Sequence, residues 1–320
     1  MPSHILVFLK KSVLRQCSWS IVCLLGVAYF TGWVQGVGAV QYNPQAQMEV
    51  KVMEVDFRKN EQGRQLKALV YQPQGRGPFP VILDLHGGAW NHKDRRAERP
   101  MDFALAKSGL LVVAIDLTLG PDAPYPANIQ DANYGVRWLK YHAKDWNGDA
   151  SHIGIYGSST GGHIAQLVAL RPNDPRYNAI AFPQAPQLDA KVAFVATRSP
   201  ISNPFARYEN AVSKKREEMI NNHLVYFKPW EAIHEASPQE ILDRKEAVSL
   251  VPLLIMHGEK DDNVPPEAQK IFAQTYQAAG GEVQLLFFKD SEHEWVAKEG
   301  PQTDKARETV KAFIAKQLQP

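Results

Sequence analysis

The chain has 320 residues, of which 44% are hydrophobic and 22% are charged, and its formal net charge is +2. These proportions are those of an ordinary globular protein with one large domain, and they exclude a disordered, collagen-like or coiled-coil chain. The small net charge predicts no broad basic surface for nucleic acid.

The first 39 residues differ in kind from the rest. They contain no acidic residue, and an apolar run follows three cations: Lys10, Lys11 and Arg15. This order is typical of an export signal, and we expect cleavage after Ala39. The alternative is an uncleaved membrane anchor, because residues 18–34 approach the ~20 residues that span a bilayer.

Either form of this leader places the rest of the chain outside the cytoplasm. The chain would then be a periplasmic or secreted protein, or one held at a membrane.

Both cysteines, Cys17 and Cys23, lie in the leader. The remaining chain therefore has no disulfide framework, cysteine-ligated metal site or thiol nucleophile. We predict a linker over 40–48, a catalytic domain over 49–320, and no cofactor.

Strands and helices are predicted to alternate along this domain. Two segments with alternating apolar residues, 49–57 and 66–71, predict an antiparallel edge hairpin. Apolar runs typical of buried strands follow at 81–85, 110–116, 153–156, 191–197, 251–256 and 283–288. Helices are expected at 98–107, from Pro126 to Leu139, and at 164–170, 267–277 and 303–318. The alternation predicts an α/β fold with a mostly parallel sheet covered by helices on both faces.

Residues 198–246 interrupt this alternation. Charged residues and aromatics crowd there, and helices are predicted at 210–221 and 238–244. One interpretation is a small helical lid whose aromatic side chains shape an acyl or aromatic pocket. An ordinary helical excursion with its own minor core is equally consistent with the pattern.

The segment 157–161 reads Gly-Ser-Ser-Thr-Gly, which fits G-x-S-x-G in one register and places Ser159 at its centre. A strand precedes it and a helix follows, so a tight turn would project the hydroxyl from the edge of the sheet. A serine hydroxyl is a poor nucleophile unless a base removes its proton. The same pentapeptide also fits a purely structural turn.

A second glycine-rich turn, His-Gly-Gly-Ala-Trp at 86–90, follows the predicted buried strand 81–85. Consecutive glycines leave backbone amides unshielded and let the chain approach a ligand closely. A plain tight turn before the next helix is the structural alternative.

The last third of the chain supplies an acid and a base. The strand 251–256 leads into His-Gly-Glu-Lys-Asp-Asp-Asn-Val-Pro-Pro from His257, and His293 follows the last strand. The order serine, acid, histidine resembles that of α/β-hydrolases from about residue 50 to the end of the chain. The segment that begins at His257 is similar to those of esterases and of prolyl-oligopeptidase-type serine hydrolases.

This resemblance implies an α/β-hydrolase fold and a triad of Ser159, Asp261 and His293, with Asp262 as the next acid to consider. His293 would accept the serine proton and Asp261 would hold its tautomer. The turn at 86–90 resembles the HGGG-like loop of lipases and esterases. By that resemblance, three backbone amides would form the oxyanion hole: those of Gly88, Ala89 and Thr160.

Further expectations concern the surroundings of this triad. Trp90 and Trp295, which stand beside its loops, are expected to bind substrate. Two acids flank the base, Glu292 and Glu294, and we hypothesise that they raise the pKa of His293 or discourage anionic substrates. The three other histidines near these motifs lack carboxylates at ligand spacing, so zinc hydrolysis is not favoured: His86, His163 and His257.

Together these features predict an exported serine hydrolase that cleaves small-molecule carboxylic esters through an acyl-enzyme. A prolyl-oligopeptidase-type peptidase is the alternative enzyme, and it is less favoured because no β-propeller is predicted before the hydrolase domain. A non-catalytic binding protein of the same fold is a third hypothesis, although such relatives typically lose a triad member. Membrane attachment is expected only if the leader is uncleaved.

Overall fold

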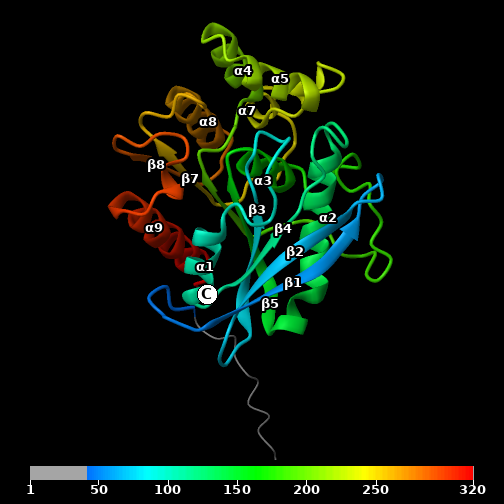
Figure 1. The fold of residues 1–320 in the computed structure, drawn as a ribbon, viewed down its shortest axis with the longest axis vertical. Coiled ribbons are helices and arrows are strands. Elements are labelled where there is room, and N and C mark those ends of the chain that lie inside the picture. The colour runs from blue at the N-terminus through cyan, green and yellow to red at the C-terminus, as the bar shows by residue number, and fades with distance from the viewer. Residues whose placement is uncertain (1–41, 320) are drawn as a thin grey trace, which may run out of the picture. The chain divides into compact units, whose positions relative to one another are not determined.

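The computed structural model describes residues 42–319 (Figure 1). The export signal or anchor expected at 1–39 lies outside these residues. No helix within 42–319 is both long and apolar enough to cross a membrane.

A single twisted sheet runs through the described part of the chain. Its eight strands, in spatial order, are β1 (Val50–Lys59), β2 (Gln65–Pro73), β4 (Leu111–Ile115), β3 (Phe79–Leu85), β5 (Gly148–Ser158), β6 (Phe194–Arg198), β7 (Leu253–Gly258) and β8 (Val283–Phe288). The pairs β1–β2 and β2–β4 are antiparallel, and all later pairs are parallel. The predicted edge hairpin and parallel sheet are therefore confirmed.

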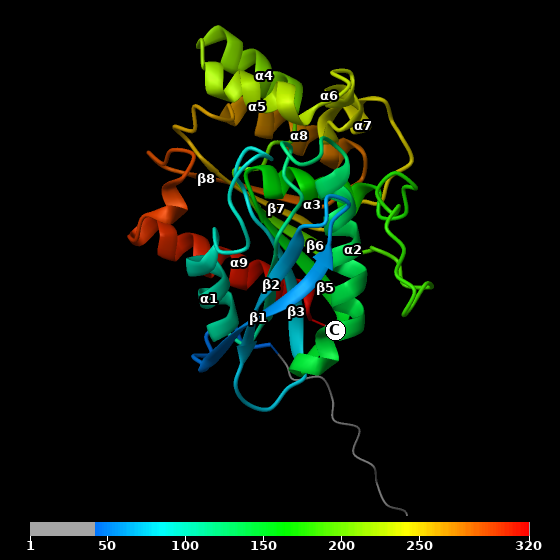
Figure 2. The ribbon, with the colours of Figure 1, turned by 45° about the vertical axis from the view of Figure 1, so that its right-hand side comes forward.

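Helices cover both faces of the sheet, because its central strands are apolar on both faces (Figures 1 and 2). One face packs against α1 (Arg99–Lys107) and α9 (Pro301–Gln317). The other packs against α2 (Ala127–His142), α3 (Thr160–Leu170) and α8 (Pro266–Ala278). Two short 3-10 helices are η1 (Ala143–Trp146) and η2 (Trp295–Ala297). This is the doubly covered α/β architecture predicted from the sequence.

The segment 198–246 forms four helices that gather beyond one end of the sheet (Figure 2). They are α4 (Pro204–Ser213), α5 (Glu217–Tyr226), α6 (Ala232–Glu235) and α7 (Pro238–Asp243). The prediction of one helix over 210–221 is wrong. Asn203 caps α4 by accepting from the amide of Ala206, so this helix begins earlier, and Lys215 with a φ of 53° breaks it from α5.

The predicted linker contacts the helices of the domain. Residues 42–49 form neither helix nor strand. The amide of Met48 donates to the carbonyl of Lys107 at 2.8 Å, and the hydroxyls of Tyr42 and Ser108 lie 2.8 Å apart. Gln45 donates to Glu308 at 3.0 Å, so these residues reach both α1 and α9.

Asp116, directly after β4, joins three parts of the chain. Its carboxylate accepts from the amides of Lys67 and Arg95 at 3.0 and 3.2 Å, and from Nη1 of Arg95 at 2.9 Å. Both side chains of the Arg95–Asp116 ion pair are almost fully buried. Arg95 also pairs with Glu54, which is partly exposed at the surface. Removing Asp116 would therefore leave the buried guanidinium with one carboxylate partner instead of two, and would leave the amides of Lys67 and Arg95 without their acceptor.

We predict that Asp116→Ala lowers the free energy of unfolding by about 3–5 kcal/mol, measured as a reduced urea midpoint. The matched control is Asp122→Ala, because Asp122 pairs with Arg64 at 3.2 Å on the surface. That change is expected to cost less than about 1 kcal/mol. Equal midpoints for the two variants would contradict the structural role of Asp116.

Candidate active site

Ser159 occupies the turn between β5 and α3 with a φ of 51° and a ψ of −116°. Few non-glycine residues adopt a positive φ, so the surrounding chain must impose it. A Cβ on Gly161 would lie 1.9 Å from the carbonyl oxygen of Leu85, and one on Gly157 would lie 2.5 Å from that of Gly161. The two glycines of the G-x-S-x-G motif therefore permit the close approach that this turn requires.

The structure brings Ser159, His293 and Asp261 into one hydrogen-bonded chain. Nε2 of His293 lies 2.9 Å from Oγ of Ser159, and Nδ1 lies 2.8 Å from Oδ2 of Asp261. The other carboxylate oxygen of Asp261 accepts from the amides of Asn263 and Val264 at 3.0 and 2.9 Å. These contacts fix Asp261 as the partner of the imidazole, and Asp262 points elsewhere, to an ion pair with Arg216.

The pKa of His293 lies below its ordinary value of 6.5. Burial is the main cause, because it disfavours the charged imidazolium, and the charges of Arg198 and Arg207 act in the same direction. The hydrogen bond and charge of Asp261 oppose this effect without cancelling it. The imidazole is thus held neutral, the form that can accept a proton.

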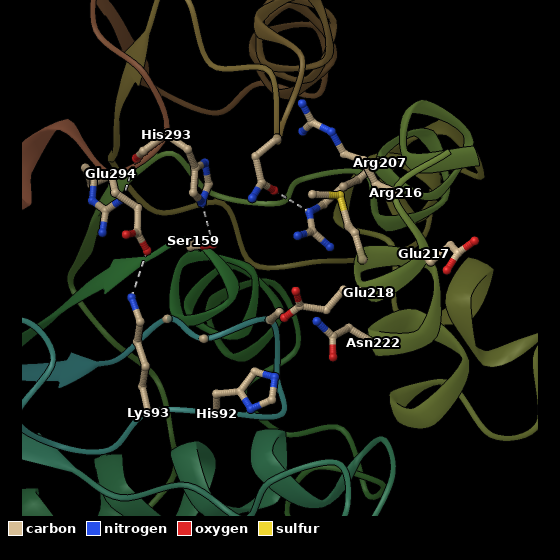
Figure 3. A pocket seen from close by; sticks show the side chains of 16 residues that line it. His92, Lys93, Ser159, Arg207, Arg216, Glu217, Glu218, Asn222, His293 and Glu294 are labelled. Atoms are coloured by element: carbon tan, nitrogen blue, oxygen red, sulfur yellow. Dashed lines mark hydrogen bonds and ion pairs between the residues drawn. The ribbon is translucent and has the colours of Figure 1, made fainter. Parts of the chain in front are cut away.

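The hypothesis that the flanking acids give His293 a raised pKa is wrong, because the net shift is downward and burial dominates it. Glu294 does attract the imidazolium, since the charge of His293 lowers the pKa of Glu294, but this effect is outweighed. Glu294 is neutralised by Lys93, whose Nζ lies 2.9 Å from its carboxylate (Figure 3). Glu292 is largely exposed, and its nearest cation is Lys298 at 3.9 Å. Solvent and these lysines weaken the field of both acids at the imidazole.

Asp261 remains ionised despite its burial. Burial raises the pKa of its carboxyl, but the hydrogen bond and charge of His293, together with His257 and the amide of Val264, more than offset it. The pKa of Asp261 is therefore below its ordinary value. An ionised Asp261 can stabilise an imidazolium on His293.

The glycine-rich turn after β3 lies beside the serine. Gly88, Ala89 and Trp90 all have a positive φ, and a Cβ on Gly88 would lie 2.1 Å from the carbonyl oxygen of His92. The structure records no hydrogen bond from the amides of Gly88 and Ala89 to any residue between 42 and 319. Thr160 opens α3, where the first amides of a helix have no partner within the helix.

A cavity of about 480 Å³ contains Ser159, His293, Gly88 and Ala89 (Figure 3). Helices α4 and α5 of the 198–246 segment supply its far wall. Most side chains on that wall are charged or polar, contrary to the aromatic pocket considered for the lid. A lid movement of these helices stays a prediction.

The expectation that Trp90 and Trp295 bind substrate is wrong. Trp90 is 2% exposed, donates through Nε1 to His163 at 3.1 Å, and stacks on Tyr226. Trp295 is 6% exposed and stacks on Phe288 at 4.2 Å. Both rings belong to the hydrophobic core and neither lines the cavity, because the loops that carry them turn these side chains inward.

Of the other histidines near the motifs, His86 and His257 bond locally, whereas His163 contacts distant segments. His86 contacts the carbonyl of Gly87 at 2.7 Å, and His257 contacts that of Val264 at 3.0 Å. Buried His163 accepts from Trp90 and is 2.7 Å from the carbonyl of Ala236. Between residues 42 and 319, no group of three His, Cys, Asp or Glu side chains is placed to hold a metal ion.

Sequence reasoning missed Arg198, which supports the base. Arg198 is the last residue of β6, its Nη1 donates to the backbone carbonyl of His293 at 2.8 Å, and its Nη2 lies 3.3 Å from Glu98. This buried pair ties the His293 loop to the segment before α1. No local motif marks either residue, because the contact joins positions a hundred residues apart.

Comparisons with known proteins relate the chain to ester hydrolases. The chain is 29% identical to the probable carboxylic ester hydrolase LipM of Mycobacterium tuberculosis over 202 residues, 61% of this chain and 44% of LipM. It is 26% identical to the esterase LipC of the same organism over 247 residues, 74% of this chain and 58% of LipC. The chain therefore spans about half the length of these curated relatives.

Solved esterases share the fold. Esterase 2 of Thermogutta terrifontis with propionate bound superimposes with a TM-score of 0.64 at 21% identity, covering 84% of this chain and 94% of that one. An inhibited esterase B of Lactobacillus rhamnosis gives a TM-score of 0.69 at 19% identity, covering 85% and 89%. The predicted α/β-hydrolase fold of esterase type is thus confirmed. Because the BD-FAE family matches residues 69–276, the chain belongs to that family.

Proposed function

We propose that this protein is a serine hydrolase that cleaves carboxylic esters through an acyl-enzyme. The single observation that carries the proposal is the hydrogen-bonded chain from Ser159 through His293 to Asp261. A neutral imidazole 2.9 Å from the serine oxygen is in place to remove its proton as that oxygen attacks a carbonyl carbon.

The first half-reaction forms the acyl-enzyme. Oγ of Ser159 bonds to the carbonyl carbon and its proton passes to Nε2 of His293, while Asp261 stabilises the imidazolium. The imidazolium then protonates the leaving alcohol as the ester C–O bond breaks. In the second half, His293 takes a proton from water, the hydroxide attacks the acyl carbon, and Ser159 leaves with its proton restored.

The negative charge of each tetrahedral intermediate requires hydrogen-bond donors. The amides of Gly88 and Ala89 lie in the cavity without a partner among residues 42–319, and the amide of Thr160 opens a helix. These features support their role as the oxyanion hole, where one lost donor typically costs about 10²–10³ in rate. The partial positive charge at the start of α3 acts in the same direction.

The relatives support an ester substrate, because LipM and LipC are named as a carboxylic ester hydrolase and an esterase. Another structure of the Thermogutta esterase is phosphonylated by sarin. Peptidase activity and non-catalytic binding are the remaining alternatives. We also propose that residues 1–39 direct the catalytic domain out of the cytoplasm.

We predict that Ser159→Ala lowers kcat for p-nitrophenyl acetate by at least about 10³, because the nucleophile is lost. Asp261→Asn is expected to lower kcat by about 10²–10⁴, because the amide cannot fix the same tautomer of His293. Asp262→Asn is the matched control, because Asp262 is 64% exposed and pairs with Arg216 outside the triad. It is expected to stay within about threefold of the wild type.

Two results would contradict this account. One is a Ser159→Ala variant that keeps most of its activity, and the other is an Asp262→Asn variant as impaired as Asp261→Asn. Faster cleavage of a dipeptidyl amide than of p-nitrophenyl acetate by the wild type would favour the peptidase alternative.

The pH dependence of kcat/KM follows from the lowered pKa of His293. Because only neutral His293 accepts the serine proton, activity is lost as the pH falls through its pKa. We predict that the acid limb of the profile has its midpoint below pH 6.5. Glu292→Gln is expected to leave this midpoint unchanged, because Glu292 is exposed to solvent. A wild-type midpoint above pH 6.5 would show that the imidazolium is stabilised rather than disfavoured.

A further inference from the structure

Four cations line the cavity that contains Ser159: Lys93, Arg198, Arg207 and Arg216. Three of them have a carboxylate partner. Lys93 pairs with Glu294 at 2.9 Å, Arg198 with Glu98 at 3.3 Å, and Arg216 with Asp262. Arg207 forms no ion pair with any carboxylate in the described residues, although it is only 3% exposed. An unpaired buried charge is unfavourable, so its presence in a ligand cavity calls for a partner that the chain does not supply.

Neutral groups hold the guanidinium of Arg207 in place. Its Nε donates to Oδ1 of Asn263 at 2.8 Å, and its Nη1 lies 3.2 Å from Nε2 of His223 (Figure 3 shows the first contact). Nδ1 of His223 lies 2.7 Å from the carbonyl of Met219, so Nδ1 carries the proton and Nε2 accepts from Arg207. The ring of Trp90 packs against the guanidinium, with its centroid 5.6 Å away.

These contacts fix the orientation of Arg207 without neutralising its charge. Burial lowers the pKa of His223 to about 3, so this partner is uncharged at neutral pH. Burial also lowers the pKa of Arg207 to about 10, which still leaves the guanidinium charged. For its Nη2, no hydrogen bond to any residue of the 42–319 range is recorded, so Nη2 retains both of its N–H donors for a ligand.

Arg207 lies close to the reacting groups. The charge of Arg207 lowers the pKa of His293. The charge of Asp261 acts on the pKa of Arg207 in the opposite direction to burial, by favouring the charged guanidinium. Figure 3 shows its side chain reaching from the α4 wall toward the part of the cavity that holds Ser159. A ligand group bound to Nη2 would therefore belong to the same molecule whose ester carbonyl meets the serine.

Acidic residues limit where an anion can bind. Glu217 and Glu218, in the first turn of α5, line the same cavity, and neither forms an ion pair with Arg207. They repel an anion elsewhere along this wall. A guanidinium donates well-directed hydrogen bonds to a planar carboxylate. A carboxylate therefore fits Arg207, which has no ion-pair partner between residues 42 and 319.

We propose that Arg207 binds a free carboxylate carried by the ester substrate, so that the enzyme prefers esters whose acyl or alcohol part bears a carboxylate. This inference rests on the proposed function, because it concerns the substrate of the same serine. Arg207 is a specificity residue in this account, and it takes no part in bond making or breaking.

The test compares kcat/KM for matched anionic and neutral esters in a pH-stat. Monomethyl glutarate against dimethyl glutarate places the carboxylate on the acyl part. 4-Carboxyphenyl acetate against its methyl ester places it on the alcohol part. For at least one pair, Arg207→Gln is expected to lower the anionic-to-neutral ratio by about 10- to 100-fold, the size of a charge-assisted hydrogen bond.

The matched control is Arg216→Gln, which removes a charge from the same cavity that Asp262 already neutralises. It is expected to change the ratio by less than about threefold. Arg207→Lys keeps the charge while losing the planar fork, and it should give an intermediate ratio even if Arg207→Gln folds poorly. The proposal is overturned if Arg207→Gln and Arg207→Lys leave both ratios unchanged, or if Arg216→Gln lowers them equally.

A binding measurement separates this proposal from the proposed function. Calorimetry with glutarate on the Ser159→Ala protein needs no catalysis. Binding that Arg207→Gln weakens at least about tenfold supports the carboxylate site even if no ester is hydrolysed, a result that would overturn only the esterase assignment. The opposite outcome is that the wild type hydrolyses the neutral esters, while glutarate binds equally well to Ser159→Ala with and without Arg207→Gln. That outcome would overturn the role of Arg207 and leave the esterase assignment standing.

Discussion

The site depends on one steric constraint, the close approach of the serine turn to the end of β3. Gly161 contacts the carbonyl of Leu85 so tightly that no side chain fits between them. The positive φ of Ser159 costs on the order of 1–3 kcal/mol, and the sheet around it compensates. Its amide donates to the carbonyl of Arg198 at 2.8 Å, which anchors the turn to β6.

The parallel strands determine which loops meet at this turn. The loops after β3, β5, β7 and β8 leave the same edge of the sheet, where open α/β sheets bind ligands. They carry the glycine turn, Ser159, Asp261 and His293 respectively. Four segments far apart in sequence thus converge because their strands share one direction, and the helices from 198–246 add a charged wall above them.

The chemistry-bearing positions were predictable because their signals are local. Ser159 stands in a five-residue motif between a strand and a helix, and Asp261 and His293 follow strands whose apolar runs are plain. Strand direction then brings these loops together without knowledge of side-chain packing. The predicted fold was recovered for the same reason, since continuous apolar runs mark strands buried on both faces.

Features that depend on tertiary packing were not predictable. The direction of the Trp90 ring follows from a backbone with positive φ and from a stack on Tyr226, more than 130 residues away. The break between α4 and α5 lies in a charged run that favours a helix locally. Arg207 stands in no recognisable motif. Its role is inferred from tertiary structure, because it is buried beside the cavity and forms no ion pair with a carboxylate among the described residues.

The most direct measurement is the intact mass of the protein after reaction with a fluorophosphonate, followed by peptide mapping. The account predicts one phosphonyl group per chain, attached to Ser159, and no adduct in Ser159→Ala. It also predicts much slower labelling in His293→Ala, because the base is lost. An adduct on another residue, or equal labelling of the wild type and Ser159→Ala, would contradict the assignment of Ser159 as the nucleophile.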